Sequence, residues 1–227
     1  MSYEFRSDYV EIERPNLVFP ALPSLGGIYR RRLKRGLDVL LVLFASVPVL
    51  LVVGLLALIV RRDGHSAFYS QDRIGMNGQH FRLWKLRTMV PDADAALAAH
   101  LESDPAAAAE WLVHQKLKND PRITSFGRIL RATSLDELPQ LWNVMLGDMA
   151  IVGPRPMMPC QQELYPGCEY YRMRPGITGF WQISERSSTS FADRARFDRD
   201  YYRRISLATD LRTIARTVGV VLRRTGI

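Results

Sequence analysis

The sequence predicts a mostly α-helical protein with a small β-hairpin (fold class α+β): a re-entrant membrane helix, then a globular domain on the cytoplasmic face with amphipathic interfacial helices. Three observations predict this fold: one long apolar segment with basic residues at both ends, one strong hairpin signal, and stretches of helical periodicity. We expect residues 1–30 to form an N-terminal extension, residues 31–62 the basic-flanked membrane helix, and residues 63–227 the globular domain.

The composition favours anionic partners. Lys and Arg number 31 against 23 Asp and Glu, which gives the 227 residues a formal net charge of +8. Such an excess suits nucleic acid, anionic lipid headgroups or phosphorylated substrates, and composition alone does not choose among them. Cys160 and Cys168 have neither disulfide-framework nor CxxC spacing, so a reduced, cytoplasmic setting is expected. The histidines form no HExxH-type set, so no transition-metal site is expected.

The apolar segment runs from Leu37 to Val60, and Asp38 is its only ionisable residue. It lies too far from the N-terminus to be a secretory signal. As a straight helix it would measure roughly 36 Å, against about 30 Å for the hydrocarbon core of a bilayer. Its length therefore permits a transmembrane span.

Two features favour a re-entrant helix instead. Pro48 removes a backbone hydrogen bond and predicts a bend, and Ser46 can donate to a freed carbonyl there. Clusters of Lys and Arg prefer the cytoplasmic side, and both ends of this segment carry them. A helix that breaks at Pro48 and returns keeps both clusters on that side. A simple span and a buried core helix of a soluble protein remain as alternatives. The basic flanking residues are Arg30, Arg31, Arg32, Lys34, Arg35, Arg61 and Arg62.

The first part of the globular domain shows a hairpin and a helix. Phe68–Met89 contains two strand-like runs around Gly75 and Asn77-Gly78, a strong turn signal. Asp92–Lys118 is Ala-rich with acidic residues in its first turn, which predicts a surface helix.

The second part is expected to contain two helices separated by loops. One helix should run from Ser134 to about Leu146, and the Gly- and Pro-rich residues Gly147–Gly179 should form loops with short turns. Asp210–Arg224 is helical by pattern, with apolar residues on one arc and arginines facing away. It either lies on a membrane surface or packs on the core with a solvated face. The apolar arc comprises Leu211, Ile214, Ala215, Val218, Val221 and Leu222.

Asp136 and Glu137 are the first candidate site residues. With Ser134 they fit a capping box, in which the serine caps a helix and the glutamate bonds back to it. A carboxylate near a helix N-terminus could also ligate Mg²⁺ or attack phosphorus. Both interpretations apply to the same residues.

Several basic residues are candidates for phosphate binding. Arg155 is held between two prolines in Gly-Pro-Arg-Pro, and a fixed guanidinium suits bidentate phosphate binding. Arg174 and Arg186 flank a second Gly-rich loop, and Lys85 and Arg87 lie two positions apart on one strand face. For each of them, ordinary surface charge is the alternative.

Together these motifs resemble a known family. The order KRGLD plus apolar segment, YSQDRIGMNGQHFRLWKLRTM, LRATSLDELPQLWNVMLGDMAIVGPRP, RPGITGFWQI and DLRTI resembles the bacterial sugar transferases, which are monotopic polyprenyl-phosphate phosphoglycosyl transferases. The resemblance runs from about Arg32 to the C-terminus. Because the several N-terminal membrane helices of the larger members are missing, we expect a short form.

The resemblance implies a two-step activity at the bacterial inner membrane. Asp136 would attack the β-phosphorus of a UDP-sugar, expel UMP, and pass the sugar phosphate to polyprenyl phosphate. Glu137 would act as a base or help to place Mg²⁺, the expected cofactor, which Asp136 would bind in part. Lys85, Arg155 and Arg186 would hold phosphates. Membrane phospholipid is a further expected partner, nucleic acid is not, and a homodimer is left open.

The chain departs from the family pattern at two places. Val47 separates Ser46 from Pro48, where the family often has Ser-Pro, and Glu185 precedes Arg186, where the family often has Gly. Two rival functions are kept. One is a glycosyltransferase that uses Asp92-Ala93-Asp94 as a DxD metal motif, and the other is a non-enzymatic basic adaptor at a membrane surface or on nucleic acid. The dyad, and the lack of any recognition-helix or aromatic-platform pattern, stand against the adaptor.

Overall fold

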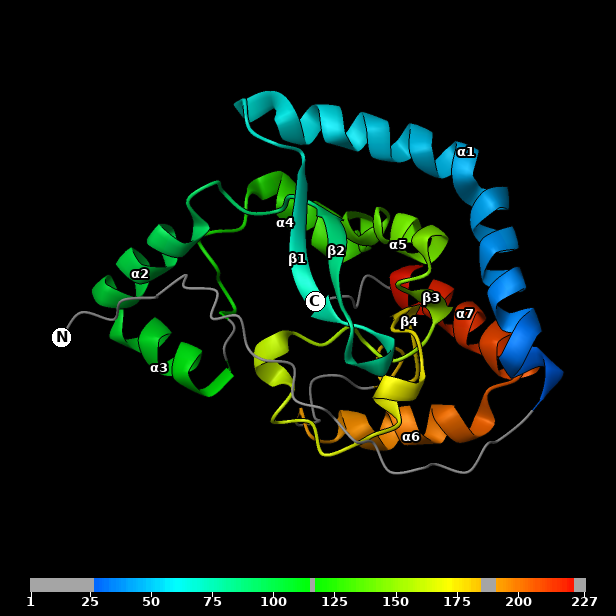
Figure 1. Cartoon of the computed structure of the whole chain (residues 1–227). Coiled ribbons are helices and arrows are strands. Elements are labelled where there is room, and N and C mark those ends of the chain that lie inside the picture. Colours follow the sequence, from blue (N-terminus) through cyan, green and yellow to red (C-terminus); the bar gives the residue numbers. More distant parts are fainter. Residues whose placement is uncertain (1–26, 115–116, 185–190, 223–227) are drawn as a thin grey trace.

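The computed structural model describes residues 27–114, 117–184 and 191–222. A π-helical turn, Tyr29–Leu33, leads into the long helix α1, Lys34–Val60, and a 3-10 turn, Arg61–Asp63, ends it. Among the described residues, this continuous helix is the one that is long and apolar enough to cross a membrane. The rest of the described chain forms shorter helices and two small two-stranded sheets (Figure 1).

Helix α1 bends partway along, so its C-terminal half crosses the top of the domain in a new direction (Figure 1). Pro48 lies inside the helix, as expected for a bend. Ser46 Oγ donates to the Leu43 carbonyl at 2.7 Å, one residue before the carbonyl that Pro48 frees. The alternative of a buried core helix is wrong, because large side chains along α1 are more than half exposed. They are Leu40, Leu43, Phe44, Val47, Leu50, Leu51, Leu55 and Leu58.

The first turns of α1 are fixed to the globular domain. Lys34 pairs with the buried Asp210 at 2.7 Å. The buried Asp38 carboxylate accepts a hydrogen bond from the Ile151 N–H at 3.3 Å. Part of the basic flank therefore contacts protein. Further donors are Arg30, to the Tyr202 carbonyl, and Arg35, to the carbonyls of Val144 and Met145.

The predicted hairpin is confirmed. Strands β1, Phe68–Ile74, and β2, His80–Leu86, pair antiparallel. The turn places Asn77 at φ 59° and Gly78 at φ 76°, a left-handed conformation that asparagine and glycine tolerate best.

The predicted helix Asp92–Lys118 is wrong in one respect, because the structure has two helices there. Helices α2, Ala93–Ser103, and α3, Pro105–His114, are separated at Asp104. Asp104 is extended, as residues before proline prefer to be. Its carboxylate caps α3 by accepting hydrogen bonds from the N–H groups of Ala106 and Ala107 at 2.9 and 3.1 Å.

The predicted start of the next helix at Ser134 is also wrong. An unpredicted helix, α4, Ser125–Thr133, ends there, and Ser134 is its left-handed C-cap at φ 57°. A 3-10 turn, Leu135–Glu137, follows, and α5 spans only Gln140–Leu146. The Ser134 side chain makes no capping hydrogen bond, so the capping box does not form.

The Gly- and Pro-rich region holds more structure than loops. Strands β3, Ala150–Val152, and β4, Gly176–Thr178, pair in parallel within it. Helix α6, Arg194–Arg204, was not predicted. Its buried Tyr201 and Tyr202 pack with Val152 and Met173 in a hydrophobic core cluster.

The last helix, α7, Leu207–Leu222, starts three residues before the predicted position. Its buried positions include Asp210 and Thr213, whereas Leu211 and Val218 of the predicted apolar arc are 49% and 53% exposed. The polar edge of α7 thus packs on the domain, and these two apolar residues face outward. Leu222 and the two arginines that end the predicted helix lie outside the part that can be described in side-chain detail.

Candidate active site

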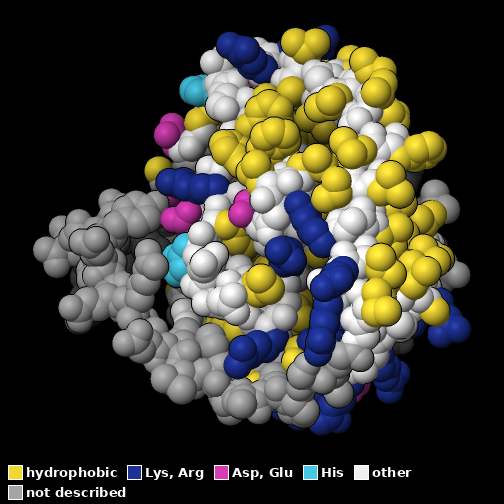
Figure 2. All heavy atoms as spheres, turned by 45° about the vertical axis from the view of Figure 1, so that its right-hand side comes forward, with side chains coloured by type: hydrophobic (Ala, Val, Ile, Leu, Met, Phe, Trp, Pro, Cys, Tyr) yellow, Lys and Arg dark blue, Asp and Glu magenta, His cyan; other side chains and the backbone are white. Residues whose placement is uncertain are grey.

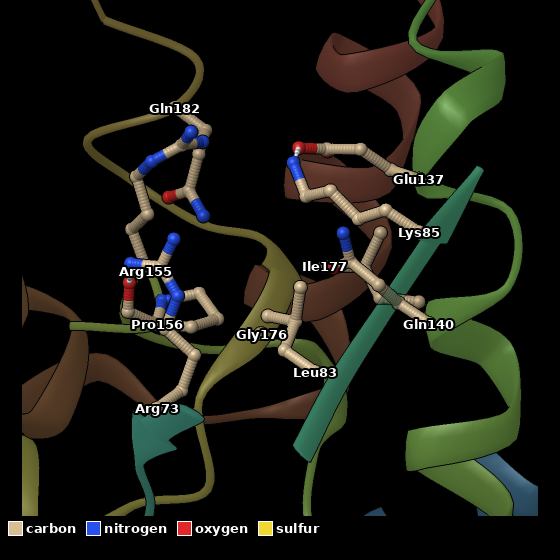
Figure 3. A pocket seen from close by; sticks show the side chains of 10 residues that line it. All are labelled: Arg73, Leu83, Lys85, Glu137, Gln140, Arg155, Pro156, Gly176, Ile177 and Gln182. Atoms are coloured by element: carbon tan, nitrogen blue, oxygen red, sulfur yellow. Dashed lines mark hydrogen bonds and ion pairs between the residues drawn. The ribbon is translucent and has the colours of Figure 1, made fainter. Parts of the chain in front are cut away.

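An open pocket, with about 290 Å³ of empty space that includes open solvent, lies between the hairpin, the 3-10 turn before α5, strand β4 and the loops that follow β3 and β4. Figure 3 shows two walls that face each other. Lys85, Glu137 and Gln140 form one wall, and Arg73, Arg155 and Gln182 form the other. The floor is made by Leu83, Gly176 and Ile177, and Pro156 completes the lining.

The first wall brings the acidic pair and a lysine together. The Lys85 ammonium lies 2.8 Å from a Glu137 carboxylate oxygen and 3.7 Å from one of Asp136. Asp136 is 6% exposed, whereas Lys85 and Glu137 are half-buried. The structure therefore joins three predicted site residues from two distant parts of the chain.

Local folding explains this placement. The left-handed Ser134 reverses the chain after α4, and the 3-10 turn then presents Asp136 and Glu137 toward β2. Asn143 on α5 donates to the Arg82 carbonyl at 2.7 Å and accepts from the Trp84 N–H at 3.1 Å. It thereby fixes the free edge of β2 next to Lys85.

The electrostatics of Asp136 are balanced between opposing effects. Burial raises the pKa of its carboxyl and Lys85 lowers it, while the Glu137 charge raises it and Arg131 lowers it. Arg131 on α4 also donates from Nε to Thr88 Oγ1 at 2.9 Å. Sequence reasoning missed Arg131, although it lies five residues before Asp136 in the same motif.

The second wall depends on close backbone packing. A Cβ on Gly176 would lie 2.1 Å from the Gly153 backbone nitrogen, so only glycine fits where these two segments cross. This crossing fixes the Gly-Pro-Arg-Pro loop and presents Arg155 to the pocket. The Arg155 guanidinium also lies 5.7 Å from the ring centroid of Trp181.

Arg73 is a further pocket residue that sequence reasoning missed. One terminal nitrogen donates to the Pro156 carbonyl at 3.2 Å and the other to Gln71 Oε1 at 2.6 Å. Burial lowers the pKa of Arg73, and so does the nearby Arg155 charge. No local sequence pattern marked this role, because the contact with the Pro156 carbonyl joins residues far apart in the chain.

The structure does not bring Arg87 to this pocket. Its guanidinium pairs with Asp63 at 2.7 Å and donates to the Val60 carbonyl at 3.2 Å, so it ties the end of α1 to the hairpin. Arg174 donates to the Gly147 carbonyl at 2.8 Å instead of lining the pocket. Arg186 lies outside the described residues.

The alternative DxD residues lie elsewhere. Asp92 and Asp94 are exposed at the start of α2, apart from the pocket lining. In the described ranges, no three His, Cys, Asp or Glu side chains are grouped to hold a metal ion. Asp136 and Glu137 offer a pair of oxygen donors, which fits Mg²⁺ because this ion takes one or two carboxylates and completes its shell with water and substrate phosphates.

A bent apolar helix fixed to a small α+β domain, with Glu137 and Lys85 across a pocket from two arginines and the buried Asp136 beside them, defines a class of protein suited to anionic ligands beside an apolar phase. The chain belongs to the bacterial sugar transferase family, whose model matches residues 29–224.

Relatives extend the match. The chain is 46% identical over 200 residues to the UDP-galactose-lipid carrier transferase of Erwinia amylovora, covering 86% of this chain and 42% of that protein. It is 44% identical over 207 residues to the exopolysaccharide production protein ExoY of Sinorhizobium fredii, covering 88% of each. It is 43% identical over 202 residues to the undecaprenyl-phosphate galactose phosphotransferase of Salmonella typhimurium, covering 86% of this chain and 42% of that protein. The chain thus spans less than half the length of two of these relatives.

Proposed function

We propose that this protein transfers a sugar 1-phosphate from a UDP-sugar to polyprenyl phosphate and releases UMP. The observation that carries the proposal is the buried Asp136 carboxylate, which lies 3.7 Å from Lys85. Lys85 and the adjacent Glu137 line a pocket whose opposite wall carries two arginines. The printed names of the Erwinia and Salmonella relatives support the substrate classes, since they specify a UDP-galactose donor and an undecaprenyl-phosphate acceptor.

In the first step, an Asp136 carboxylate oxygen attacks the β-phosphorus of the UDP-sugar. A bond from aspartate to phosphorus forms, and the bond from that phosphorus to the bridging oxygen breaks. UMP leaves with the bonding electron pair, and the sugar phosphate stays on Asp136 as an acyl phosphate. Lys85 supports this step because its charge favours the ionised carboxylate.

In the second step, an oxygen of the polyprenyl phosphate attacks the same phosphorus. The acyl-phosphate bond breaks, Asp136 returns as a carboxylate, and a polyprenyl-diphosphate sugar leaves. Glu137 would accept a proton or help to hold a cation, since its carboxylate pairs with Lys85, which also lies 3.7 Å from Asp136. Arg155 and Lys85 would hold phosphate groups across the pocket.

Mg²⁺ is the proposed cofactor, and Asp136 with Glu137 would hold it. When bound, it would neutralise charge on the diphosphate. Lys85 and the arginines that line the pocket would supply the remainder of the charge balance.

The proposed setting is the inner membrane of a bacterium, with the domain on the cytoplasmic face and α1 re-entrant. Figure 2 shows a broad hydrophobic area over the upper and right-hand parts of the face that it draws, with a group of Lys and Arg side chains along its lower left edge. The bend in α1 would return its chain to the side from which it entered. Other exposed apolar side chains that could contact the headgroup region lie on α4, α5 and α7: Ile129, Trp142, Leu146, Leu207, Leu211 and Val218.

The test uses purified protein, Mg²⁺, polyprenyl phosphate and a panel of UDP-sugars that includes UDP-galactose and UDP-glucose. The proposal expects UMP as the nucleotide product with at least one donor, and loss of that release in Asp136→Asn. A glycosyltransferase would release UDP instead, and UDP as the product would overturn the proposal.

A further inference from the structure

The second wall of the pocket holds two arginines that repel each other. Arg73 and Arg155 both line the pocket, and burial, together with the nearby Arg155 charge, lowers the pKa of Arg73. Holding two like charges together in a partly buried site costs free energy unless an anion lies between them. No carboxylate forms an ion pair with either of them among the residues that the structure describes. The nearby Asp72 pairs with Arg82 instead, at 3.1 Å.

Backbone contacts hold Arg73 in this position. Ile74 donates from its N–H to the Met157 carbonyl at 2.9 Å, and the buried Tyr170 hydroxyl donates to the Ile74 carbonyl. The same hydroxyl accepts from the Met157 N–H at 3.1 Å. The strand that carries Arg73 is therefore joined to the segment that follows Arg155, so the two guanidiniums are placed together by the fold.

The Arg73 guanidinium keeps donor capacity for a ligand. Its two terminal nitrogens bond to Pro156 and Gln71, but each carries two N–H groups, and its buried Nε makes no hydrogen bond to any part of the chain that is described. A phosphate group in the pocket could accept from these donors and remove the repulsion from Arg155.

Arg73 and Lys85 lie at opposite ends of the hairpin, and the Lys85 end adjoins α1, the proposed membrane helix. Lys85 pairs with Tyr69 near the end of the hairpin that connects to α1, whereas Arg73 pairs with Phe81 near the turn. Four residues of strand correspond to about 13 Å. The end with Lys85 is also tied to α1 through Arg87 and Asp63.

We infer that Arg73, together with Arg155, binds the departing nucleotide phosphate, while the lipid phosphate enters at the Lys85 end. The inference rests on the proposed function and adds to it a division of the pocket into two phosphate positions. It makes Arg73 a substrate-binding residue with a role in nucleotide affinity and none in affinity for the lipid.

The test compares Arg73→Gln and Arg73→Lys with the matched control Arg82→Gln, an exposed arginine on the neighbouring strand. The rate of UMP release is measured at varied concentrations of UDP-galactose or UDP-glucose, at varied concentrations of polyprenyl phosphate, and with added UMP as product inhibitor. We expect Arg73→Gln to raise both the donor KM and the UMP inhibition constant about tenfold or more. The KM for polyprenyl phosphate and all constants of Arg82→Gln should stay within about twofold of wild type.

The outcomes are distinguishable. If wild-type protein releases no UMP, the proposed function fails. Suppose that wild type is active and that folded Arg73→Gln keeps the wild-type donor KM and UMP inhibition constant, or raises the KM for polyprenyl phosphate instead. Then the inference about Arg73 is overturned, while the proposed function stands. Should Arg73→Gln fail to fold, Arg73→Lys decides the question. It keeps the charge but loses the planar fork, so UMP inhibition should weaken by several-fold, and an unchanged inhibition constant would contradict the inference.

Discussion

The Lys85 ammonium lies 2.8 Å from a carboxylate oxygen of Glu137 and 3.7 Å from a carboxylate oxygen of the neighbouring Asp136. These ion pairs join β2 to the turn before α5 at the pocket wall. This contact places a cation where it favours the ionised form of the proposed nucleophile. Several consequences can be measured.

Replacing Lys85 should impair transfer. In Lys85→Met the carboxyl of Asp136 loses the main charge that lowers its pKa, so less of it is ionised, and a phosphate contact is lost as well. We expect kcat/KM for UMP release to fall about 100-fold, with Lys85→Arg retaining part of the activity. Arg82→Met, on the exposed side of the same hairpin, serves as the control. A Lys85→Met protein with full turnover would show that this contact is dispensable.

Asn143 should matter for stability. Asn143 is fully buried, and Asn143→Ala removes the hydrogen-bond partner of both the Arg82 carbonyl and the Trp84 N–H. We expect the free energy of unfolding to fall by about 2–4 kcal/mol in denaturant titrations, because each buried group left without a partner costs about 1–3 kcal/mol. Gln79→Ala, an exposed substitution at the hairpin turn, should change it little. Equal stability of the two variants would refute this role.

The bend at Pro48 should set the topology of α1. In a chain that lacks Cys160 and Cys168, His65→Cys should react with a membrane-impermeant thiol reagent only from the cytoplasmic side. In the same chain Pro48→Ala restores a helical N–H and should shift part of the population to a span, so some labelling appears from outside. A chain that keeps only the exposed Cys160 reports on which side of the membrane the globular domain lies. If the His65→Cys chain that keeps Pro48 is labelled from outside, α1 spans the membrane and the re-entrant topology is wrong.

Asp198 should make stability depend on pH. Burial raises the pKa of its carboxyl to about 7, and its partner is the Tyr165 hydroxyl at 2.7 Å. Its stabilising contribution is therefore fully present below the ordinary carboxyl pKa and is lost as the pH rises through about 7. Asp198→Asn should abolish this decline in thermal unfolding between about pH 4 and 7, whereas Asp200→Asn on the same helix should preserve it. A wild-type profile that rises over this range would contradict the assignment.

The sequence was most informative where local chemistry decides the structure. The Asn77-Gly78 turn tolerates positive φ, and Pro48 lacks an N–H, so the hairpin and the bend in α1 were both predictable. Long-range packing decided the rest. Ser134 looked like an N-cap, but it ends α4, because tertiary contacts rather than the capping pattern set the chain direction there.

The candidate site was predictable only where its residues belong to local sequence motifs. Asp136, Glu137 and Arg155 stand out within their motifs, and the structure gathers them with Lys85 around one pocket or against its wall. Arg73 carried no such local signal, because its proximity to Arg155 arises from the contact between the hairpin turn and the segment after β3.

The most direct test of the account is the mass of the Asp136 peptide after incubation with Mg²⁺ and a productive UDP-sugar in the absence of polyprenyl phosphate. We expect an added sugar phosphate on Asp136, which is released when polyprenyl phosphate is supplied, and no adduct in Asp136→Asn. Turnover to UMP with the adduct on another residue, or with full activity in Asp136→Asn, would contradict it.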